Sequence, residues 1–101
     1  MITFEYRFDV LPGKAKDYRK YLARAGKDIW LKFSGVRAVR TYQSMLGGAS
    51  PQRVVQVDLD SLAALEKILL NQAFKKTKET FHGLVTNVSD SLLVKVSEKK
   101  R

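Results

Sequence analysis

An alternation of apolar and polar residues predicts that the chain begins with a β-strand over positions 2–10. Apolar side chains stand at the even positions and polar ones between them, so the strand presents one face to a core and one polar face. The apolar set is Ile2, Phe4, Tyr6, Phe8 and Val10, and the polar set is Thr3, Glu5, Arg7 and Asp9. Pro12 and Gly13 then end the strand, because proline lacks a backbone N–H and glycine permits a turn.

Periodicity elsewhere predicts helical regions and three further strands, and Asp60 or Ser61 can cap the second helical region. The expected elements are a helix over 14–33, strands over 36–44 and 53–59, helical segments over 62–69 and 71–83, and a last strand over 92–96. This βαββαβ order indicates a ferredoxin-like fold of the α+β class, with an antiparallel four-stranded sheet and the helices on one face. We expect one domain over 1–96 and a basic tail over 97–101.

The polar face of this sheet is the first candidate for a functional surface. Strand alternation places a set of polar side chains on it, namely Glu5, Arg7, Asp9, Arg40, Tyr42, Gln56 and Asp58. If two such sheets packed face to face, this surface would line a polar chamber. The same charges could instead pair across neighbouring strands as structural ion pairs, and the sequence leaves both interpretations open.

Composition and charge narrow the classes of function. The 101 residues include no cysteine, which removes disulfides, thiolate metal sites and a cysteine nucleophile. No long apolar segment or leader is visible, so we expect a soluble cytoplasmic protein without a membrane partner. The net charge of +9 resides largely on the first helix and the tail. The basic residues of the helix are Lys14, Lys16, Arg19, Lys20, Arg24, Lys27 and Lys32, and those that end the tail are Lys99, Lys100 and Arg101.

These charges are typical of a solvated helix face and a frayed terminus. The alternative is non-specific nucleic-acid binding, or a purely structural or interaction role, through the basic helix and tail. Sequence-specific RNA recognition on the sheet would need aromatic residues on the open face of the third strand, which has none over 53–58.

Other common chemistries lack their residues. Gly47 and Gly48 are not followed by the lysine of a phosphate-binding loop. One histidine without any cysteine argues against a dedicated zinc site. A serine triad would have to use His82 without a nucleophile elbow. Trp30 is expected to pack with Ile29 and Phe33 rather than to stack on a ligand.

Three short segments resemble the small dimeric α+β barrel proteins, and most closely the antibiotic-biosynthesis monooxygenase-like group with the related haem-degrading monooxygenases. The segments are Leu11-Pro12-Gly13-Lys14, Phe33-Ser34-Gly35 and Leu70-Asn71-Gln72-Ala73-Phe74-Lys75. The resemblance implies a homodimer in which two sheets lie face to face, with a cavity in each subunit for a small molecule. The ligand would lie in a pocket between sheet and helices.

The resemblance also bears on cofactors. Haem-degrading members use a histidine shortly after the phenylalanine of the second helical region, where Lys78 stands here. They also use an asparagine on the first strand, near the place of Tyr6 and Arg7, and a tryptophan after the third strand, near that of Asp58 or Asp60. A lysine amine is protonated at neutral pH and ligates iron poorly, so we expect no haem and no other cofactor.

A cofactor-free oxygenase, in which the substrate's own anion reduces oxygen, is the activity that the resemblance leaves. For such a site we predict Arg7, Arg40 and Gln56 as substrate-binding residues, because their side chains can hold an anionic oxygen. Asp58, Tyr42 and His82 are the predicted catalytic residues, Asp58 as a base if burial raises its pKa and Tyr42 as a hydrogen-bond donor. A dimer that binds a small metabolite without catalysis is the remaining alternative.

Overall fold

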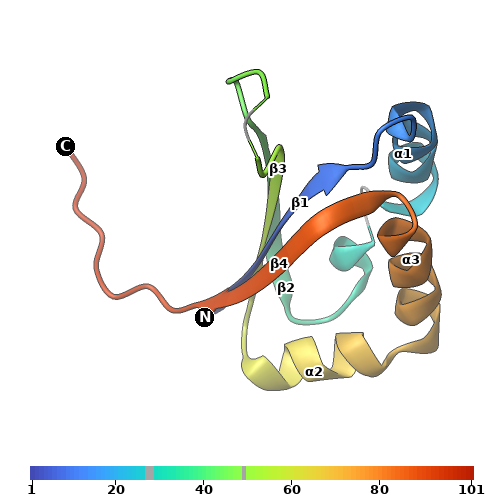
Figure 1. Cartoon of the computed structure of the whole chain (residues 1–101). Helices are drawn as coiled ribbons and strands as arrows, with labels where there is room; N and C mark the ends of the chain where they lie inside the picture. Colours follow the sequence, from blue (N-terminus) through green and yellow to red (C-terminus); the bar gives the residue numbers. More distant parts are fainter. Residues whose placement is uncertain (27–28, 49) are drawn as a thin grey trace.

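The computed structural model describes residues 1–26, 29–48 and 50–101, and it has the predicted βαββαβ order (Figure 1). Its elements are β1 (Ile2–Val10), α1 (Ala15–Tyr21), a π-helical turn η1 (Leu22–Gly26), a 3₁₀ turn η2 (Trp30–Lys32), β2 (Val36–Gln43), β3 (Arg53–Leu59), α2 (Leu62–Leu70), α3 (Gln72–His82) and β4 (Val85–Leu93). The sheet order is β2-β3-β1-β4 with antiparallel neighbours, and the helices lie together on one side of it. The predicted fold class is therefore confirmed.

The sheet places the apolar side of β1 against the helices. Phe4 lies opposite Val57 of β3, and Tyr6 lies opposite Val55, so both strands direct apolar side chains to the same face. The buried core that results is Phe8, Tyr18, Ile29, Trp30, Val55, Val57, Leu59, Leu65, Ile68, Phe74 and Val85. Aromatic side chains from both layers thus meet in the space between sheet and helices, and the predicted packing role of Trp30 is confirmed.

Local hydrogen bonds explain where α2 and α3 begin. The Ala64 N–H donates to Ser61 Oγ (3.2 Å), as predicted for the cap of α2. The Phe74 N–H donates to Asn71 Oδ1 (3.0 Å), so Asn71 ends one helix and caps the next. This break turns α3 relative to α2, and α3 then packs against α1 and β4.

Two predicted elements were wrong. The helix expected over 14–33 is α1 followed by the short turns η1 and η2, and Lys27, which was assigned to that helix, lies outside the described residues. The last strand is β4 (Val85–Leu93), not 92–96. Its backbone pairs with β1 although Ser89, Asp90 and Ser91 show no apolar alternation, and a β-bulge between Arg7 and Asp9 shifts the register.

The chain beyond β4 leaves the sheet. Residues 94–101 run in extended form away from the rest of the molecule (Figure 1), and Val94 and Val96 are exposed. Among the described helices, none has the length and apolar character required to cross a membrane.

Candidate small-molecule site

A cavity lined largely by aromatic side chains lies between the sheet and the helices, and we call it the aromatic cavity. Its volume is about 60 Å³. It is lined by Phe4, Tyr6, Tyr21, Ile29, Trp30, Leu69, Phe74, Lys78, Phe81, His82, Val88 and Asp90. Pockets for drug-sized ligands have volumes of roughly 300–1,000 Å³, so the cavity as it stands suits a small ring or a few water molecules. A larger ligand would require side chains at the entrance to move.

The walls of the cavity are aromatic rings in edge contact. The Trp30 and Phe74 ring centroids lie 4.9 Å apart, and those of Tyr6 and Phe81 lie 5.7 Å apart, both in edge-on geometry. This arrangement is favourable for ring quadrupoles.

Tyr6 places one polar atom inside these walls. The Trp30 Nε1–H donates to the Tyr6 hydroxyl oxygen (3.2 Å), which fixes the position of that oxygen. Among the described residues, no group accepts a hydrogen bond from the Tyr6 hydroxyl, so its proton is available to a ligand. Burial raises the pKa of Tyr6 well above its ordinary value of 10.0, and burial raises the pKa of Tyr21 to about 12. Both phenols are therefore neutral donors at pH 7.

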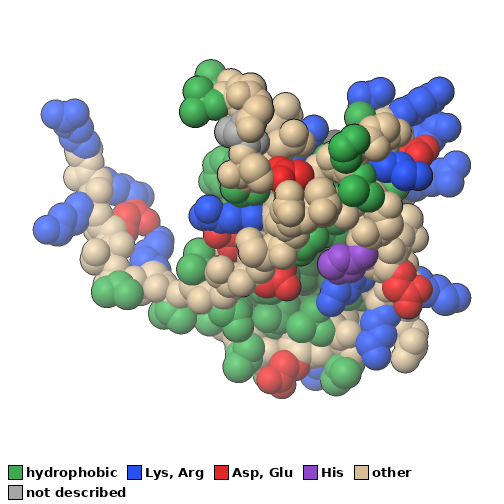
Figure 2. Space-filling model, in the orientation of Figure 1, with side chains coloured by type: hydrophobic (Ala, Val, Ile, Leu, Met, Phe, Trp, Pro, Cys, Tyr) green, Lys and Arg blue, Asp and Glu red, His purple; other side chains and the backbone are tan. Residues whose placement is uncertain are grey.

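Polar residues of α3 and β4 stand at the entrance. Lys78 and His82 lie one helical turn apart on α3 and line the same cavity, as their spacing predicts. His82, the only histidine and purple in Figure 2, is exposed at the surface, and its ring lies edge-on to Phe81 with centroids 5.6 Å apart. Asp90 of β4, opposite Tyr6 in the strand register, supplies a carboxylate.

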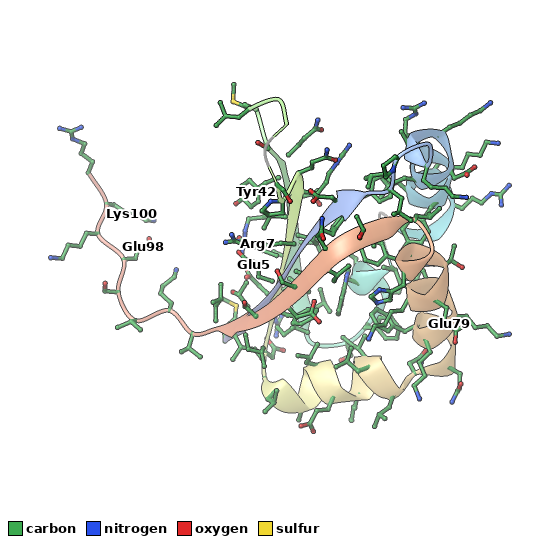
Figure 3. All side chains as sticks on the ribbon, in the orientation of Figure 1. Glu5, Arg7, Tyr42, Glu79, Glu98 and Lys100 are labelled. Carbon is green, nitrogen blue, oxygen red and sulfur yellow. The ribbon has the colours of Figure 1, made fainter. Side chains whose placement is uncertain are left out.

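The other predicted site residues lie on the opposite face of the sheet, away from the aromatic cavity. Figure 3 shows Glu5, Arg7 and Tyr42 on the side that faces away from the helices. Residues paired across the strands place Arg40, Gln56 and Asp58 on the same face. The structure thus brings five of the six predicted site residues together on this open face and His82 alone to the cavity; the five are Arg7, Arg40, Tyr42, Gln56 and Asp58.

Charges on the open face pair with one another. Arg40 binds Asp58 through two hydrogen bonds, Nη1 to Oδ2 (2.7 Å) and Nη2 to Oδ1 (2.8 Å). Glu5 accepts hydrogen bonds from Arg7 Nε (2.9 Å) and from Gln56 Nε2 (2.9 Å). This geometry matches the structural ion pairs that the sequence left open as an alternative.

The condition under which Asp58 was predicted to act as a base, a pKa raised by burial, is not met. The hydrogen bonds from Arg40 lower the pKa of Asp58 to about 2, against an ordinary value of 3.8, and the effect outweighs the opposing effect of burial. A carboxylate that holds its charge so strongly is a weak proton acceptor near pH 7, since catalytic bases operate best with a pKa near the working pH.

Asp9 does not share the open-face network, and it lies beside the bulge, where β4 has one residue more than β1. Its carboxylate accepts hydrogen bonds from Ser50 Oγ (2.5 Å), the Gln52 N–H (2.6 Å) and Asn87 Nδ2 (3.0 Å). These donors lower its pKa and tie the β2–β3 loop to β4. Asp9 is therefore a structural anchor between two segments distant in sequence.

Sequence reasoning assigned no ligand role to most of the cavity lining. Tyr6 and Phe4 were assigned to the core because of their alternation, and this assignment is correct as far as it goes. The signal that was missed is the Tyr6 hydroxyl, the polar atom among the apolar side chains of β1, because a buried phenol needs a hydrogen-bond partner. Asp90 lies in a strand whose residues lack clear alternation, so nothing in the pattern placed it beside Tyr6.

The aromatic cavity does not fit haem. A volume of about 60 Å³ is far below the size of a porphyrin, and the cavity-lining residue near the position of the family's ligand histidine is Lys78. Within the described ranges, no group of three or more His, Cys, Asp or Glu side chains is placed to hold a metal ion.

The chain is similar to known proteins in structure. No protein-family model matches the chain, and no curated protein matches it in sequence. SnoaB from Streptomyces nogalater, a cofactor-independent oxygenase, superposes with a TM-score of 0.80 at 16% identity, over 96% of this chain and 94% of SnoaB. A Deinococcus radiodurans protein described as a candidate antibiotic biosynthesis monooxygenase gives a TM-score of 0.76 at 13% identity, over 100% of this chain and 98% of the other.

A third similar structure has no known function. It is a dimeric protein with a ferredoxin-like fold from Bacteroides fragilis, with a TM-score of 0.73 at 10% identity over 91% of this chain and 93% of the other. Identities this low carry the fold and not the activity. The chain has the ferredoxin-like α+β fold of the antibiotic-biosynthesis monooxygenase-like proteins.

Proposed function

We propose that this chain is a homodimeric small-molecule-binding protein that acts as a monooxygenase-like enzyme without haem, with its ligand in the aromatic cavity. The observation that carries the proposal is the Tyr6 hydroxyl, held by Trp30 inside an aromatic enclosure, with no acceptor for its proton among the described residues. A planar ligand that carries an anionic oxygen would stack on the rings and accept this proton in a hydrogen bond.

The chemistry follows from what the cavity offers. A ligand with an acidic C–H loses that proton to a base and becomes a carbanion, which can donate an electron to O₂. Formation of a C–O bond followed by loss of water then converts a CH₂ group and O₂ into a carbonyl group and H₂O. We assign His82 as the base and Tyr6 as the donor that stabilises the anion, since both line the cavity. The apolar walls exclude water from the anion.

The open face is assigned to the contact between two copies. A sheet face can enter an interface only if its charges are compensated, because an unpaired buried charge is strongly unfavourable. Asp58 and Glu5 already have cationic partners in Arg40 and Arg7 within one chain. Tyr42, half exposed, adds an aromatic side chain of the kind enriched at interfaces. Arg7, Arg40, Tyr42, Gln56 and Asp58 would then act in assembly rather than in ligand binding.

Anthrone is a suitable probe because its CH₂ group is acidic and lies between two aromatic rings. It is larger than the aromatic cavity of about 60 Å³, so its binding requires the side chains at the entrance to move. We expect protein-dependent oxygen uptake with anthrone, measured with an oxygen electrode, and at least about a tenfold loss of rate in Tyr6→Phe, equivalent to about 1.4 kcal/mol. The matched control is Tyr42→Phe, which removes the same hydroxyl from the open face and should leave the rate unchanged. Circular dichroism checks that both variants fold.

Several results would separate the alternatives. Chemical-shift changes confined to the cavity residues without oxygen uptake would identify a binding protein that is not an oxygenase. Equal rates in Tyr6→Phe and the wild-type protein would remove Tyr6 from the mechanism. Loss of oxygen uptake in Tyr42→Phe alone, in a variant that light scattering shows to be a dimer like the wild-type protein, would return the site to the open face.

A second candidate function is non-specific polyanion binding. A groove of about 430 Å³ between α1 and α3 gathers Lys20, Arg24 and Lys76 from the helical layer. Figure 2 shows Lys and Arg side chains gathered over these helices and on the tail. Affinity for a labelled single-stranded oligonucleotide should fall at least about tenfold between roughly 50 and 200 mM salt if this is correct. Binding that does not respond to salt would contradict it.

A further inference from the structure

A second hollow lies at the end of the sheet near the beginning of α1, and we call it the arginine hollow. It has a volume of about 300 Å³ and is lined by Val10, Leu11, Pro12, Gly13, Ala15, Tyr18, Arg19, Gln52 and Arg53. It shares no lining residue with the aromatic cavity. Two arginines and no carboxylate are among its described lining residues, whereas the aromatic cavity includes Asp90 and the groove between α1 and α3 includes Asp17.

Arg53 is held in place by an aromatic ring but keeps an unsatisfied hydrogen-bond donor. Its guanidinium lies over the Tyr18 ring, 5.4 Å from the centroid, in cation–π geometry. Its Nε is buried and has no hydrogen-bond partner in the part of the chain that the structure describes. No ion pair joins Arg53 or Arg19 to a carboxylate among the same residues. A buried N–H without a partner is unfavourable and calls for an explanation.

The nearest acidic residue along β1 does not supply the missing partner. Asp9 precedes Val10 of the hollow, but its carboxylate is occupied by Ser50, Gln52 and Asn87. Its role as an anchor of the β2–β3 loop therefore leaves the charge of Arg53 uncompensated by this carboxylate.

We infer that the arginine hollow binds an oxyanion, the phosphate or carboxylate group of a small molecule, between Arg19 and Arg53. A guanidinium presents N–H groups in a planar fork that matches the oxygens of either group. Binding in this way requires the Arg53 side chain to rotate so that its buried Nε–H meets the anion, which would satisfy the donor that is now unpaired. Tyr18, Val10 and Leu11 supply the apolar wall for the rest of the ligand. This site is separate from the proposed oxygenase function, and neither depends on the other.

The test is a titration of the full chain with inorganic phosphate and, separately, with acetate, at constant ionic strength, followed by amide chemical shifts. We expect saturable shifts at residues 10–13, 18–19 and 52–53. Arg53→Gln should weaken binding at least tenfold, and Arg19→Gln should weaken it severalfold. Arg24→Gln is the matched control, because it removes the same charge from the groove between α1 and α3 and should leave the affinity unchanged.

Arg53→Lys keeps the positive charge over Tyr18 and removes the planar guanidinium, so it tests the site even if Arg53→Gln fails to fold. An affinity between those of the wild-type protein and Arg53→Gln would support recognition of the anion by the planar guanidinium. Tighter binding of phosphate than of acetate would favour a phosphorylated ligand, and the reverse would favour a carboxylate ligand. The inference is overturned if neither anion gives saturable shifts, or if the shifts spread over all basic helices and Arg24→Gln weakens binding as much as Arg53→Gln.

Discussion

Replacement of Asp58 by asparagine tests whether this carboxylate is a structural ion-pair partner or a proton acceptor. Asp58 accepts two hydrogen bonds from Arg40 and a third from Thr3 Oγ1 (2.8 Å), across three neighbouring strands. The Asp58→Asn substitution keeps the shape of the side chain but removes its charge. The ion-pair interpretation predicts a loss of stability that depends on pH, and the catalytic interpretation predicts a titration near neutral pH.

The magnitude follows from the pKa. A fall in the pKa of Asp58 from 3.8 to about 2 corresponds to about 2.4 kcal/mol. The Arg40 side chain is 39% exposed and the pair lies on an open face, where water screens the charges, so we expect about 1 kcal/mol. Because the pKa of the folded state is the lower one, this contribution is fully present above about pH 4. It is lost as the pH falls through about 2.

Urea unfolding at one fixed protein concentration, followed through Trp30 fluorescence, measures the effect. The difference between the wild-type protein and Asp58→Asn should be about 1 kcal/mol at pH 7 and should shrink toward zero by pH 2. Asp90→Asn is the matched control, since Asp90 is exposed and makes no ion pair or side-chain hydrogen bond in the described ranges. A carbon-13 titration of the Asp58 carboxyl with a midpoint above about 4, or a stability difference that persists at pH 2, would refute the reasoning.

Three further changes probe the fold around the site. Gly35→Ala should lower the free energy of unfolding in urea by about 1–3 kcal/mol, because the φ of Gly35 is +90° and the new Cβ would lie 2.7 Å from Ala64 Cβ. Gly13→Ala is the milder control, because Gly13 has φ +79° but open space around it, and equal losses of stability in the two variants would contradict the packing argument. Phe74→Ala should lower the free energy of unfolding by about 3–5 kcal/mol, since Phe74 is only 5% exposed. A loss of stability below about 1 kcal/mol in the same assay would mean that the core repacks. Asn71→Ala should lower the free energy of unfolding by about 1 kcal/mol and reduce the protection of amide protons from hydrogen exchange in the first turn of α3 alone. Loss of this protection along all of α3 would show that Asn71 does more than cap the helix.

Elements with a regular pattern were predictable from the sequence. β3 was expected over 53–59 and spans Arg53–Leu59, because Val55, Val57 and Leu59 alternate with more polar residues. Gly83 was expected to end the second helical region, and α3 ends at His82. In both cases the local pattern and the tertiary environment favour the same structure.

Elements formed mainly by partner strands were not predictable. β4 is selected by the free edge of β1, whose backbone groups accept a strand of nearly any composition, so the polar run over 89–91 is strand all the same. The apolar run over 92–96 looked more like a strand, yet it has only Leu92 and Leu93 opposite β1. Long-range backbone pairing outweighed β-propensity here.

The residues of the candidate site were also hard to predict from the sequence, because it does not show which polar groups the fold pairs. Polar residues drew attention on the open face because alternation exposes them, but Arg40 and Asp58 satisfy each other there. A polar group whose partners are supplied by its neighbours needs no ligand. Tyr6 and Arg53 are the opposite case, because each holds a donor that the described chain does not satisfy: the Tyr6 hydroxyl proton and the Arg53 Nε–H. The sequence shows which residues are polar, and only the packed structure shows which polar groups lack a partner; those groups mark both proposed binding sites.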